Sequence, residues 1–177
     1  MPNVMIRRAK LSDAADIGAV HVSVWRATYD DIAPQALKDR LDTHRGAPYW
    51  AEELQTLLQS SGKEGGVFVA ETDEICGFAR YGFDSGVVSE RKGEIKHLYV
   101  SLNHQGKGLG AQLLRAALLA VKSAGAATAQ LAVVKQNVLA RAFYEHHGGQ
   151  AVGEFRDAGP LWRSENVIMQ WSLRDVL

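Results

Sequence analysis

The chain of 177 residues carries 20 basic and 20 acidic side chains, so its formal net charge at pH 7 is zero. This length suits a single domain, residues 1–177, with its own hydrophobic core. The charge balance argues against nucleic acid as the main partner, and no apolar run is long enough to span a membrane. We expect no signal peptide, and the single cysteine, Cys76, excludes an internal disulfide. We therefore expect a cytoplasmic protein.

Hydrophobic periodicity divides the chain into helical and extended segments. The first strand is expected at 4–9, and Ser12, a good N-cap followed by Asp13 and Asp16, predicts a helix over 12–28. The later segments are predicted as helices at 35–41, 47–59, 109–124 and 137–147, and as strands at 67–72, 75–83, 94–101, 130–134, 150–156 and 166–173, with a polar loop at 84–92. The order is β-α-α-α-β-β-β-α-β-α-β-β. It places one strand–helix–strand unit inside an otherwise antiparallel sheet, an α/β (α+β) arrangement.

The charges are distributed unevenly along this order. Residues 95–144 contain six basic and no acidic side chains, whereas residues 1–94 contain 11 basic and 15 acidic ones. A cationic segment suits a polyphosphate, and an acidic segment suits a cationic substrate. Ordinary scatter of charges along a chain is the alternative interpretation.

A glycine-rich turn at 105–110, Gln-Gly-Lys-Gly-Leu-Gly, joins an apolar strand to the start of a helix. Such a turn presents backbone N–H groups that have no partner within the helix, and the helix dipole adds partial positive charge. Phosphate groups bind at such places. The glycines also remove the Cβ atoms that would keep a pyrophosphate away from the backbone.

Two common phosphate loops do not fit this turn. A Walker loop needs Ser or Thr after its Gly-Lys, and here Gly108 follows Lys107. A dinucleotide-binding loop needs an acid about 20 residues further on, and no Asp or Glu occurs in residues 95–144. A nucleotide-dependent oxidoreductase is thereby disfavoured.

The pattern Q-x-x-G-x-G, formed by Gln105, Gly108 and Gly110, resembles the acetyl-CoA pyrophosphate loop of the GNAT N-acetyltransferase superfamily. A second pattern, N-x-x-A-x-x-F-Y at 137–144, is similar to the helix that follows the fifth strand in that superfamily. Two departures concern Gly148-Gly149, where the family often has Gly-Phe, and residues 131–133, where it often has Trp. The resemblance covers most of the chain.

The resemblance implies the GNAT fold, a mixed and mostly antiparallel twisted sheet of about six to seven strands flanked by helices. It implies acetyl-CoA as acyl donor. No metal is expected, because the adjacent His146 and His147 diverge on a helix and there is no cysteine cluster. The implied cofactor-binding residues are the loop Gln105, Gly106, Lys107, Gly108, Leu109 and Gly110, the helix residues Asn137, Ala140, Phe143 and Tyr144, and a bulged strand end at Leu98, Tyr99 and Val100.

Transfer of an acetyl group to an alkyl amine needs an acid and a base, because the amine is mostly protonated at neutral pH and the thiolate must be protonated as it leaves. We expect Tyr144 to be the acid and Glu94 the base, directly or through water. Strand alternation without a bulge places His97, the alternative base, on the face opposite Glu94. Both catalytic residues have an alternative interpretation, Tyr144 as a packing residue and Glu94 as a solvated carboxylate.

The first helices cover the acceptor in the resembling proteins. Here this implies Trp25 and Tyr29, with Asp30 and Asp31 beside them, facing Tyr81 and Phe83. Aromatic rings with acids suit a cation, whereas Trp25 is equally well explained as a core residue.

We therefore expect an acetyl-CoA-dependent N-acetyltransferase that acts on a primary amine, in a small molecule or a peptide, by direct attack in a ternary complex. A non-catalytic acyl-CoA-binding sensor is the alternative. The sequence is compatible with either a monomer or a homodimer.

Overall fold

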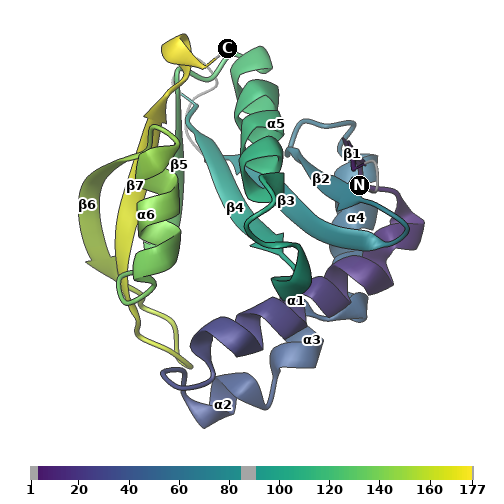
Figure 1. Cartoon of the computed structure of the whole chain (residues 1–177), viewed down its shortest axis with the longest axis vertical. Helices are drawn as coiled ribbons and strands as arrows, with labels where there is room; N and C mark the ends of the chain where they lie inside the picture. Colours follow the sequence, from purple (N-terminus) through teal and green to yellow (C-terminus); the bar gives the residue numbers. More distant parts are fainter. Residues whose placement is uncertain (1–3, 85–90, 177) are drawn as a thin grey trace.

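The computed structural model describes residues 4–84 and 91–176, which form one twisted seven-stranded sheet with helices on both faces (Figure 1). The strands are β1 (Met5–Arg8), β2 (Gly66–Glu71), β3 (Ile75–Phe83), β4 (Gly93–Val100), β5 (Thr128–Val134), β6 (Gln150–Arg156) and β7 (Glu165–Ser172). The helices are α1 (Ala14–Tyr29), α2 (Gln35–Lys38), α3 (Leu41–Arg45), α4 (Ala47–Gln59), α5 (Leu109–Ser123) and α6 (Val138–His146). Short 3₁₀ turns occur at Leu11–Asp13, Leu102–His104 and Leu173–Asp175.

The sheet has the order β1-β2-β3-β4-β5-β7-β6, and β4 with β5 is the parallel pair among antiparallel neighbours. This confirms the expected fold class and the single strand–helix–strand unit. The expected polar loop at 84–92 lies mostly outside the described residues, which omit 85–90.

One predicted helix is wrong. The helix expected at 35–41 ends at Lys38, and a separate helix, α3, begins at Leu41, so four helices rather than three precede β2. The helical path breaks at Arg40, whose ψ of 6° lies outside the α-helical region. The N–H of Asp39 closes the short α2 by donating to the carbonyl groups of Gln35 and Leu37.

The parallel strands β4 and β5 separate toward their C-terminal ends. Their pairing consists of Gly93 opposite Ala129 and Glu94 opposite Gln130. Beyond this point β4 continues to pair with β3, while β5 pairs with β7. Figure 1 shows the resulting opening between the two strands, with α5 and α6 on either side of it.

A β-bulge lies at Lys96, earlier in β4 than the expected position at 98–100. Ile95 is opposite Tyr81 and His97 is opposite Arg80, so Lys96 is the extra residue. The bulge reverses the alternation that follows. Ile95 and Leu98 therefore pack on the α5 side, while His97 and Tyr99 face the other side.

Two apolar layers hold helices against the sheet. On one face α5 buries Leu113, Leu114, Ala117, Leu118 and Val121, the residues predicted from its periodicity. On the other face α1 and α4 pack through Ile17, Val20, Trp50 and Leu54 against Val69 and Phe78 of β2 and β3.

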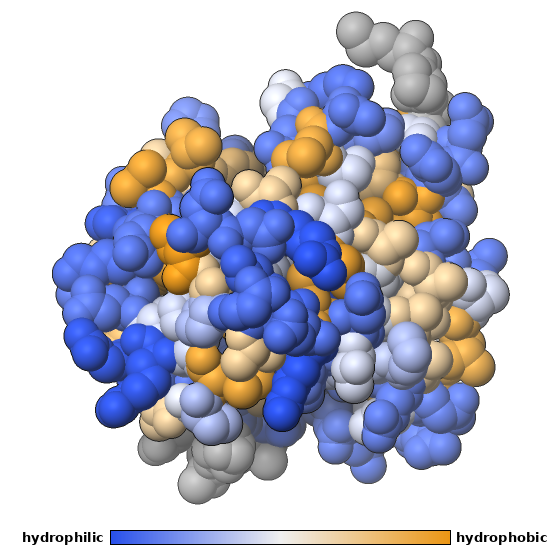
Figure 2. Space-filling model, turned by 90° about the horizontal axis from the view of Figure 1, so that it is seen from below, coloured by the Kyte–Doolittle hydropathy of each residue, from blue (hydrophilic) through white to orange (hydrophobic). Residues whose placement is uncertain are grey.

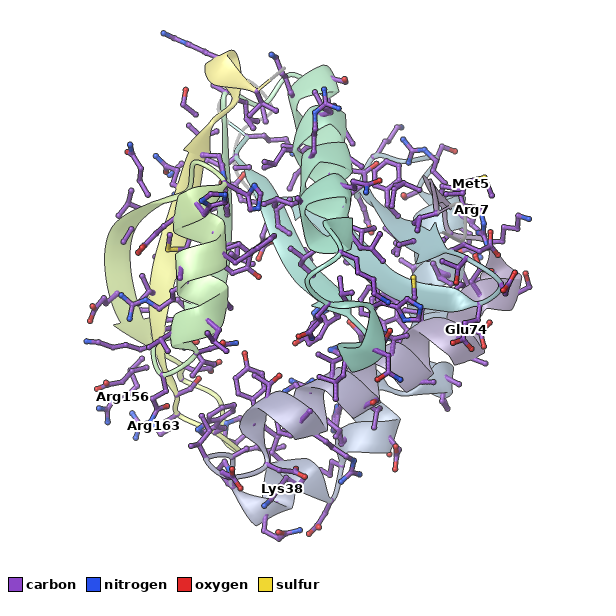
Figure 3. All side chains as sticks on the ribbon, in the orientation of Figure 1. Met5, Arg7, Lys38, Glu74, Arg156 and Arg163 are labelled. Atoms are coloured by element: carbon purple, nitrogen blue, oxygen red, sulfur yellow. The ribbon has the colours of Figure 1, made fainter. Side chains whose placement is uncertain are left out.

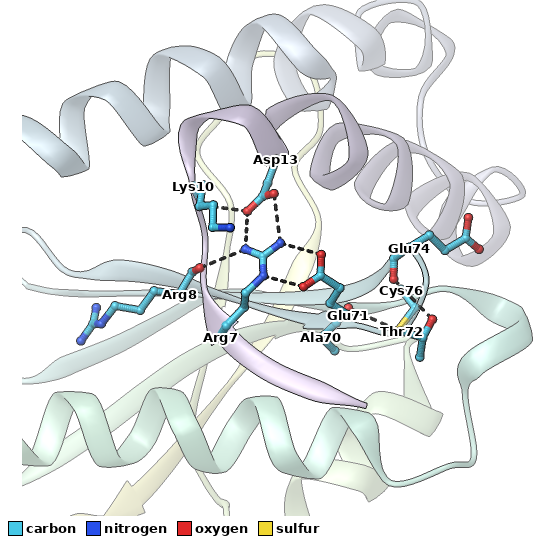
Figure 4. Close-up of polar contacts among 9 residues, drawn as sticks. All are labelled: Arg7, Arg8, Lys10, Asp13, Ala70, Glu71, Thr72, Glu74 and Cys76. Atoms are coloured by element: carbon cyan, nitrogen blue, oxygen red, sulfur yellow. Dashed lines mark hydrogen bonds and ion pairs between the residues drawn. The ribbon is translucent and has the colours of Figure 1, made fainter. Parts of the chain in front are cut away.

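The edge strand β1 is fixed to its neighbours by Arg7 (Figure 4). Its guanidinium donates to Glu71 from Nε at 2.6 Å and to Asp13 from Nη1 at 2.7 Å. Asp13 is buried, so the ion pair also fixes the start of α1 against the sheet.

Candidate active site

A cavity of about 850 Å³ occupies the opening between β4 and β5. Its wall combines five segments of the chain. They are residues 96–100 of β4, the turn and start of α5 (102, 104–106 and 108–111), residues 131–133 of β5, the region of α6 (136–140, 143, 144 and 147), and the end of α1 with the loop that follows (24, 27–29 and 32). None of the described residues that line it is Asp or Glu. Such a cavity suits an anionic ligand.

The glycine turn has the geometry of an anion site. Gly106 and Gly108 have φ values of 73° and 79°, in the left-handed region that glycine adopts without strain. A Cβ at either position would meet no atom within 4 Å, so the backbone is open to a ligand. Gly108 is the N-cap of α5 and gives it no side-chain cap, which leaves the first N–H groups of this 15-residue helix available.

The other loop positions have different tasks. The Gln105 side chain donates from Nε2 to the carbonyl of Val100 at 2.9 Å and ties the loop to the end of β4. Lys107 donates to the carbonyl of Asn103 at 2.8 Å and lies outside the cavity lining. At Gly110 a Cβ would come within 3.3 Å of the Phe143 ring, so this glycine allows α5 and α6 to approach closely.

Asn137 joins α6 to α1. Its Oδ1 accepts from the N–H of Ala140 at 3.2 Å as the N-cap of α6, and its Nδ2 donates to the Tyr29 hydroxyl at 3.1 Å. The side chain is thus held by two protein partners at the cavity wall, a role that the sequence pattern did not indicate.

Tyr144 presents a buried phenol to the cavity. Its ring packs edge-on against Trp171, with 5.9 Å between ring centres, and no hydrogen bond of its hydroxyl is found among the described residues. Tyr29 and Tyr99 also line the cavity. Burial raises the pKa of all three phenols, and the pKa of Tyr144 is raised further by Tyr99 and Tyr29. Each therefore stays protonated at neutral pH.

Glu94 lies outside the residues that line the cavity. Its carboxylate is about half exposed and 3.9 Å from the Lys96 ammonium. The bulge at Lys96 places Glu94 and His97 on the same face of the sheet, so their expected placement on opposite faces is wrong.

His97, unlike Glu94, does line the cavity. Its ring belongs to an aromatic group with His21, Trp50, Phe78 and Tyr99. Burial lowers the pKa of His97 to about 3, and the charge of Arg45 adds to this effect. His97 is therefore a neutral imidazole at physiological pH.

Only part of the expected acceptor set is brought together: the rings of Trp25 and Tyr29 are in contact, whereas Tyr81 and Phe83 lie elsewhere. Tyr29 lines the cavity, whereas Trp25 is buried beside it in the core that packs α1 against α2 and α3. Tyr81 stacks on Phe68 on the α5 side of the sheet, and Phe83 lies beneath Arg91, both outside the cavity lining. The structure instead adds Trp162, whose ring contacts Trp25 and Tyr29. A tryptophan in the loop at 157–164, between the last two strands, is the signal that could have identified it.

A smaller pocket of about 420 Å³ adjoins the cavity and shares Ile32 and Gln136 with it. Its charged lining residues are Lys135, Arg156, Arg163 and Glu165. Figure 3 shows Arg156 and Arg163 at the end of β6 and β7, on the same end of the molecule as Lys38 of α2. Seen from that end, the surface is largely hydrophilic with small separate apolar areas (Figure 2).

Residues 25–149, which include both motifs and all of the cavity lining except Val24, match the acetyltransferase (GNAT) family. The chain belongs to the GNAT acetyltransferase family. This GNAT protein is 30% identical over 172 residues to YuaI of Bacillus subtilis, an uncharacterized N-acetyltransferase, covering 95% of this chain and 92% of that one. It is accordingly an N-acetyltransferase, an enzyme that acts on amine acceptors.

Solved GNAT structures share its fold. The PaiA N-acetyltransferase of Thermoplasma acidophilum, in complex with coenzyme A, has a TM-score of 0.74 at 21% identity, covering 96% of this chain and 99% of that one. Structure yncA of Salmonella typhimurium, with acetyl-CoA, has a TM-score of 0.71 at 19% identity, covering 97% and 95%. Among the described residues of this GNAT protein, no helix is long and apolar enough to cross a membrane.

Proposed function

We propose that this GNAT enzyme uses acetyl-CoA as donor and acetylates a primary amine by direct attack while both substrates are bound. The observation that carries the proposal is the open glycine turn, Gly106 to Gly110, at the edge of a cavity whose described lining lacks carboxylates. Its N–H groups would hold the pyrophosphate, and the walls formed by β4 and β5 would hold the pantetheine arm between them.

Tyr144 is proposed as the acid that protonates the leaving thiolate. Its phenol is neutral, faces the cavity and is not engaged by another side chain among the described residues. Burial raises the pKa of a phenol, and the same apolar surroundings raise the pKa of a thiol. The two pKa values therefore move together, and proton transfer between the two groups stays feasible.

Glu94 is proposed to deprotonate the amine through water. Its exposed carboxylate stays outside the cavity lining, so direct contact with an amine inside the cavity is not the expected route. A bridging water can carry the proton from a site near His97 and Lys96 to the carboxylate.

The environment of Cys76 favours direct attack over an acyl-cysteine. The thiol is buried in the core and donates to the Ala70 carbonyl at 3.3 Å (Figure 4). Burial raises its pKa, so it is a poor nucleophile, and it is not among the residues that line the cavity.

Initial-rate kinetics test the proposal. Release of the CoA thiol is measured over a matrix of acetyl-CoA and amine concentrations, with a panel of amines to find an acceptor. Direct attack in a ternary complex predicts intersecting double-reciprocal lines. The Cys76→Ala variant should show the same intersecting pattern. Parallel lines that Cys76→Ala abolishes would establish an acyl-enzyme instead. Tight acetyl-CoA binding without thiol release from any amine would favour the sensor.

A further inference from the structure

Arg45, the last residue of α3, is a half-buried cation without a carboxylate partner among the described residues. Its guanidinium carbon lies 5.2 Å from the centre of the Trp25 ring. Two other arginines, Arg7 (half-buried) and Arg80 (buried), are paired with carboxylates, Arg7 with Asp13 and Glu71 and Arg80 with Glu53. Among the remaining half-buried arginines, Arg141 donates to the Lys135 carbonyl and Arg91 lies over the Phe83 ring. Because a partly desolvated cation is costly without a counter-ion, Arg45 is prepared for an anion from outside the chain.

The position of Arg45 connects it to the cavity wall. Trp25, on which it stacks, lies 5.4 Å from the ring centre of Tyr29, and Tyr29 lines the cavity and bonds to Asn137. On the sheet side, burial lowers the pKa of His97 and the Arg45 charge is the next largest cause. Arg45 is not itself among the residues that line either pocket, so the ring contacts through Trp25 and Tyr29 are what connect its guanidinium to the cavity wall.

The charges around the two pockets do not suit a polyamine. The large cavity has no Asp or Glu among its described lining residues, and Asp30 and Asp31, the acids expected to attract a cation, line neither pocket. The smaller pocket has three basic residues against Glu165. Lys135 and Arg156 are paired with Glu154 and Glu165, and Arg163 is exposed.

We propose that the acceptor is an amine that also bears a carboxylate, an amino acid in the broad sense, and that Arg45 binds this carboxylate. A guanidinium can hold a carboxylate through two parallel hydrogen bonds, and stacking on Trp25 fixes the plane of the guanidinium. The bound carboxylate would hold the molecule with its amine toward the acetyl group in the cavity. This inference rests on the proposed transfer reaction and names its substrate class.

Matched pairs of amines test the substrate class. Each L-α-amino acid, together with β-alanine and 4-aminobutyrate, is compared with its own carboxamide, and diamines are included. The measured quantity is kcat/KM for CoA thiol release. We expect the best acid to exceed its carboxamide by at least about tenfold, because the amide lacks the charge that Arg45 would pair with.

Variants of Arg45 test the residue. Arg45→Gln should raise KM for the acid about 10- to 100-fold, the range of a lost charge-assisted hydrogen-bond pair. The same variant should leave kcat/KM for the carboxamide and the affinity for acetyl-CoA within about twofold. Arg45→Lys keeps the positive charge but cannot form two parallel hydrogen bonds, so its KM for the acid should lie between those of the wild type and Arg45→Gln. Arg40→Gln, at an exposed arginine five residues away, is the matched control and should resemble the wild type.

The outcomes separate this inference from the reaction it rests on. Acetylation of diamines but not amino acids overturns the inference and leaves the N-acetyltransferase assignment standing. Equal rates for acids and carboxamides, or an equal loss for both in Arg45→Gln, also overturn it. Acetyl-CoA binding without thiol release from any probe overturns the proposed reaction and the inference together.

Discussion

At the residue scale, the environment of Tyr144 allows the catalytic role of its hydroxyl to be tested by removing that group alone. The ring is packed against Phe143 and Trp171, while the hydroxyl has no hydrogen bond among the described residues. Tyr144→Phe should therefore leave folding and acetyl-CoA affinity nearly unchanged. Loss of general-acid catalysis should lower kcat by about 10²- to 10⁴-fold. Tyr49→Phe, a half-buried tyrosine outside the cavity lining, is the matched control for removing a phenol.

The pKa of Tyr144 also allows a prediction for the alkaline side of the pH–rate profile. Because burial raises the pKa of Tyr144 above its usual value of about 10, the wild type should keep its acid form up to at least about pH 10. A kcat in Tyr144→Phe equal to that of the wild type would remove this residue from the chemistry.

Glu94→Gln tests the base at the same scale. The carboxylate is needed only while the amine is protonated, so the variant should lose activity at neutral pH and recover it as pH approaches the pKa of the free amine, about 10. The side chain is about half exposed and its ion pair with Lys96 is long, so stability should change by less than about 0.5 kcal/mol. Wild-type rates in Glu94→Gln at neutral pH would instead turn attention to His97, which lines the cavity.

At the element scale, Gly108 in the turn before α5 is the residue that best tests acetyl-CoA binding. Its φ of 79° means that any side chain adds strain, so the informative comparison is between two side chains of equal size. Gly108→Asn and Gly108→Asp should be destabilised similarly. Only the aspartate adds a negative charge at the helix N-terminus where the pyrophosphate is proposed to bind, so it should lose at least about tenfold more affinity for acetyl-CoA by calorimetry.

A control for backbone strain is available at the other end of the same helix. Gly125, just after α5, also has a positive φ and open space around its Cβ position. Gly125→Asp should cost stability but leave acetyl-CoA affinity unchanged. Equal affinity in the Asn and Asp variants of Gly108 would place the anion elsewhere.

Elements with strong periodicity could be predicted from sequence, and local irregularities could not. The strands at 75–83 and 150–156 have the predicted bounds, and the buried face of α5 follows from helical spacing. The bulge at Lys96 depends on how β4 pairs with β3, which no local pattern encodes, so the face of His97 was predicted wrongly. The break at Arg40 is likewise a matter of local dihedral angles rather than of hydrophobic pattern.

At the scale of the whole molecule, the sequence predicted which motif residues lie at the cavity, but not which distant residues they contact. The sequence indicated Gly108, Asn137 and Tyr144 as neighbours, and the structure places all three on one cavity. The bond from Asn137 to Tyr29 crosses 108 positions, and the contact of Arg45 with Trp25 joins separate helices. Such contacts arise only when α1 packs against α3 and beside β4, which is why the role of Arg45 could not be predicted.

Two histidines, the buried His21 and the half-buried His97, should make the stability of the whole fold sensitive to mild acid. Burial lowers the pKa of His21 to about 2 and that of His97 to about 3, whereas both titrate near 6.5 in the unfolded chain. Below about pH 6.5 the unfolded chain binds protons that the folded chain does not bind. The contribution of these two histidines to the free energy of unfolding is therefore fully present above about pH 6.5. It is lost as pH decreases toward 3, and the free energy of unfolding falls by up to about 1.4 kcal/mol per pH unit for each histidine.

Replacing one of these histidines should reduce that slope. In His21 the Nδ1 atom accepts from Trp50 Nε1 at 3.1 Å, and the amide oxygen of His21→Gln can accept the same bond. Chemical denaturation at several pH values between 5.5 and 4.5 should show a slope lower by about 1.4 kcal/mol per pH unit in this variant. His44→Gln, at an exposed histidine on α3, should keep the wild-type slope. An unchanged slope in His21→Gln would mean that the imidazole is protonated within the folded protein, and the neutral aromatic group beneath the cavity would then have to be reassigned as a charged one.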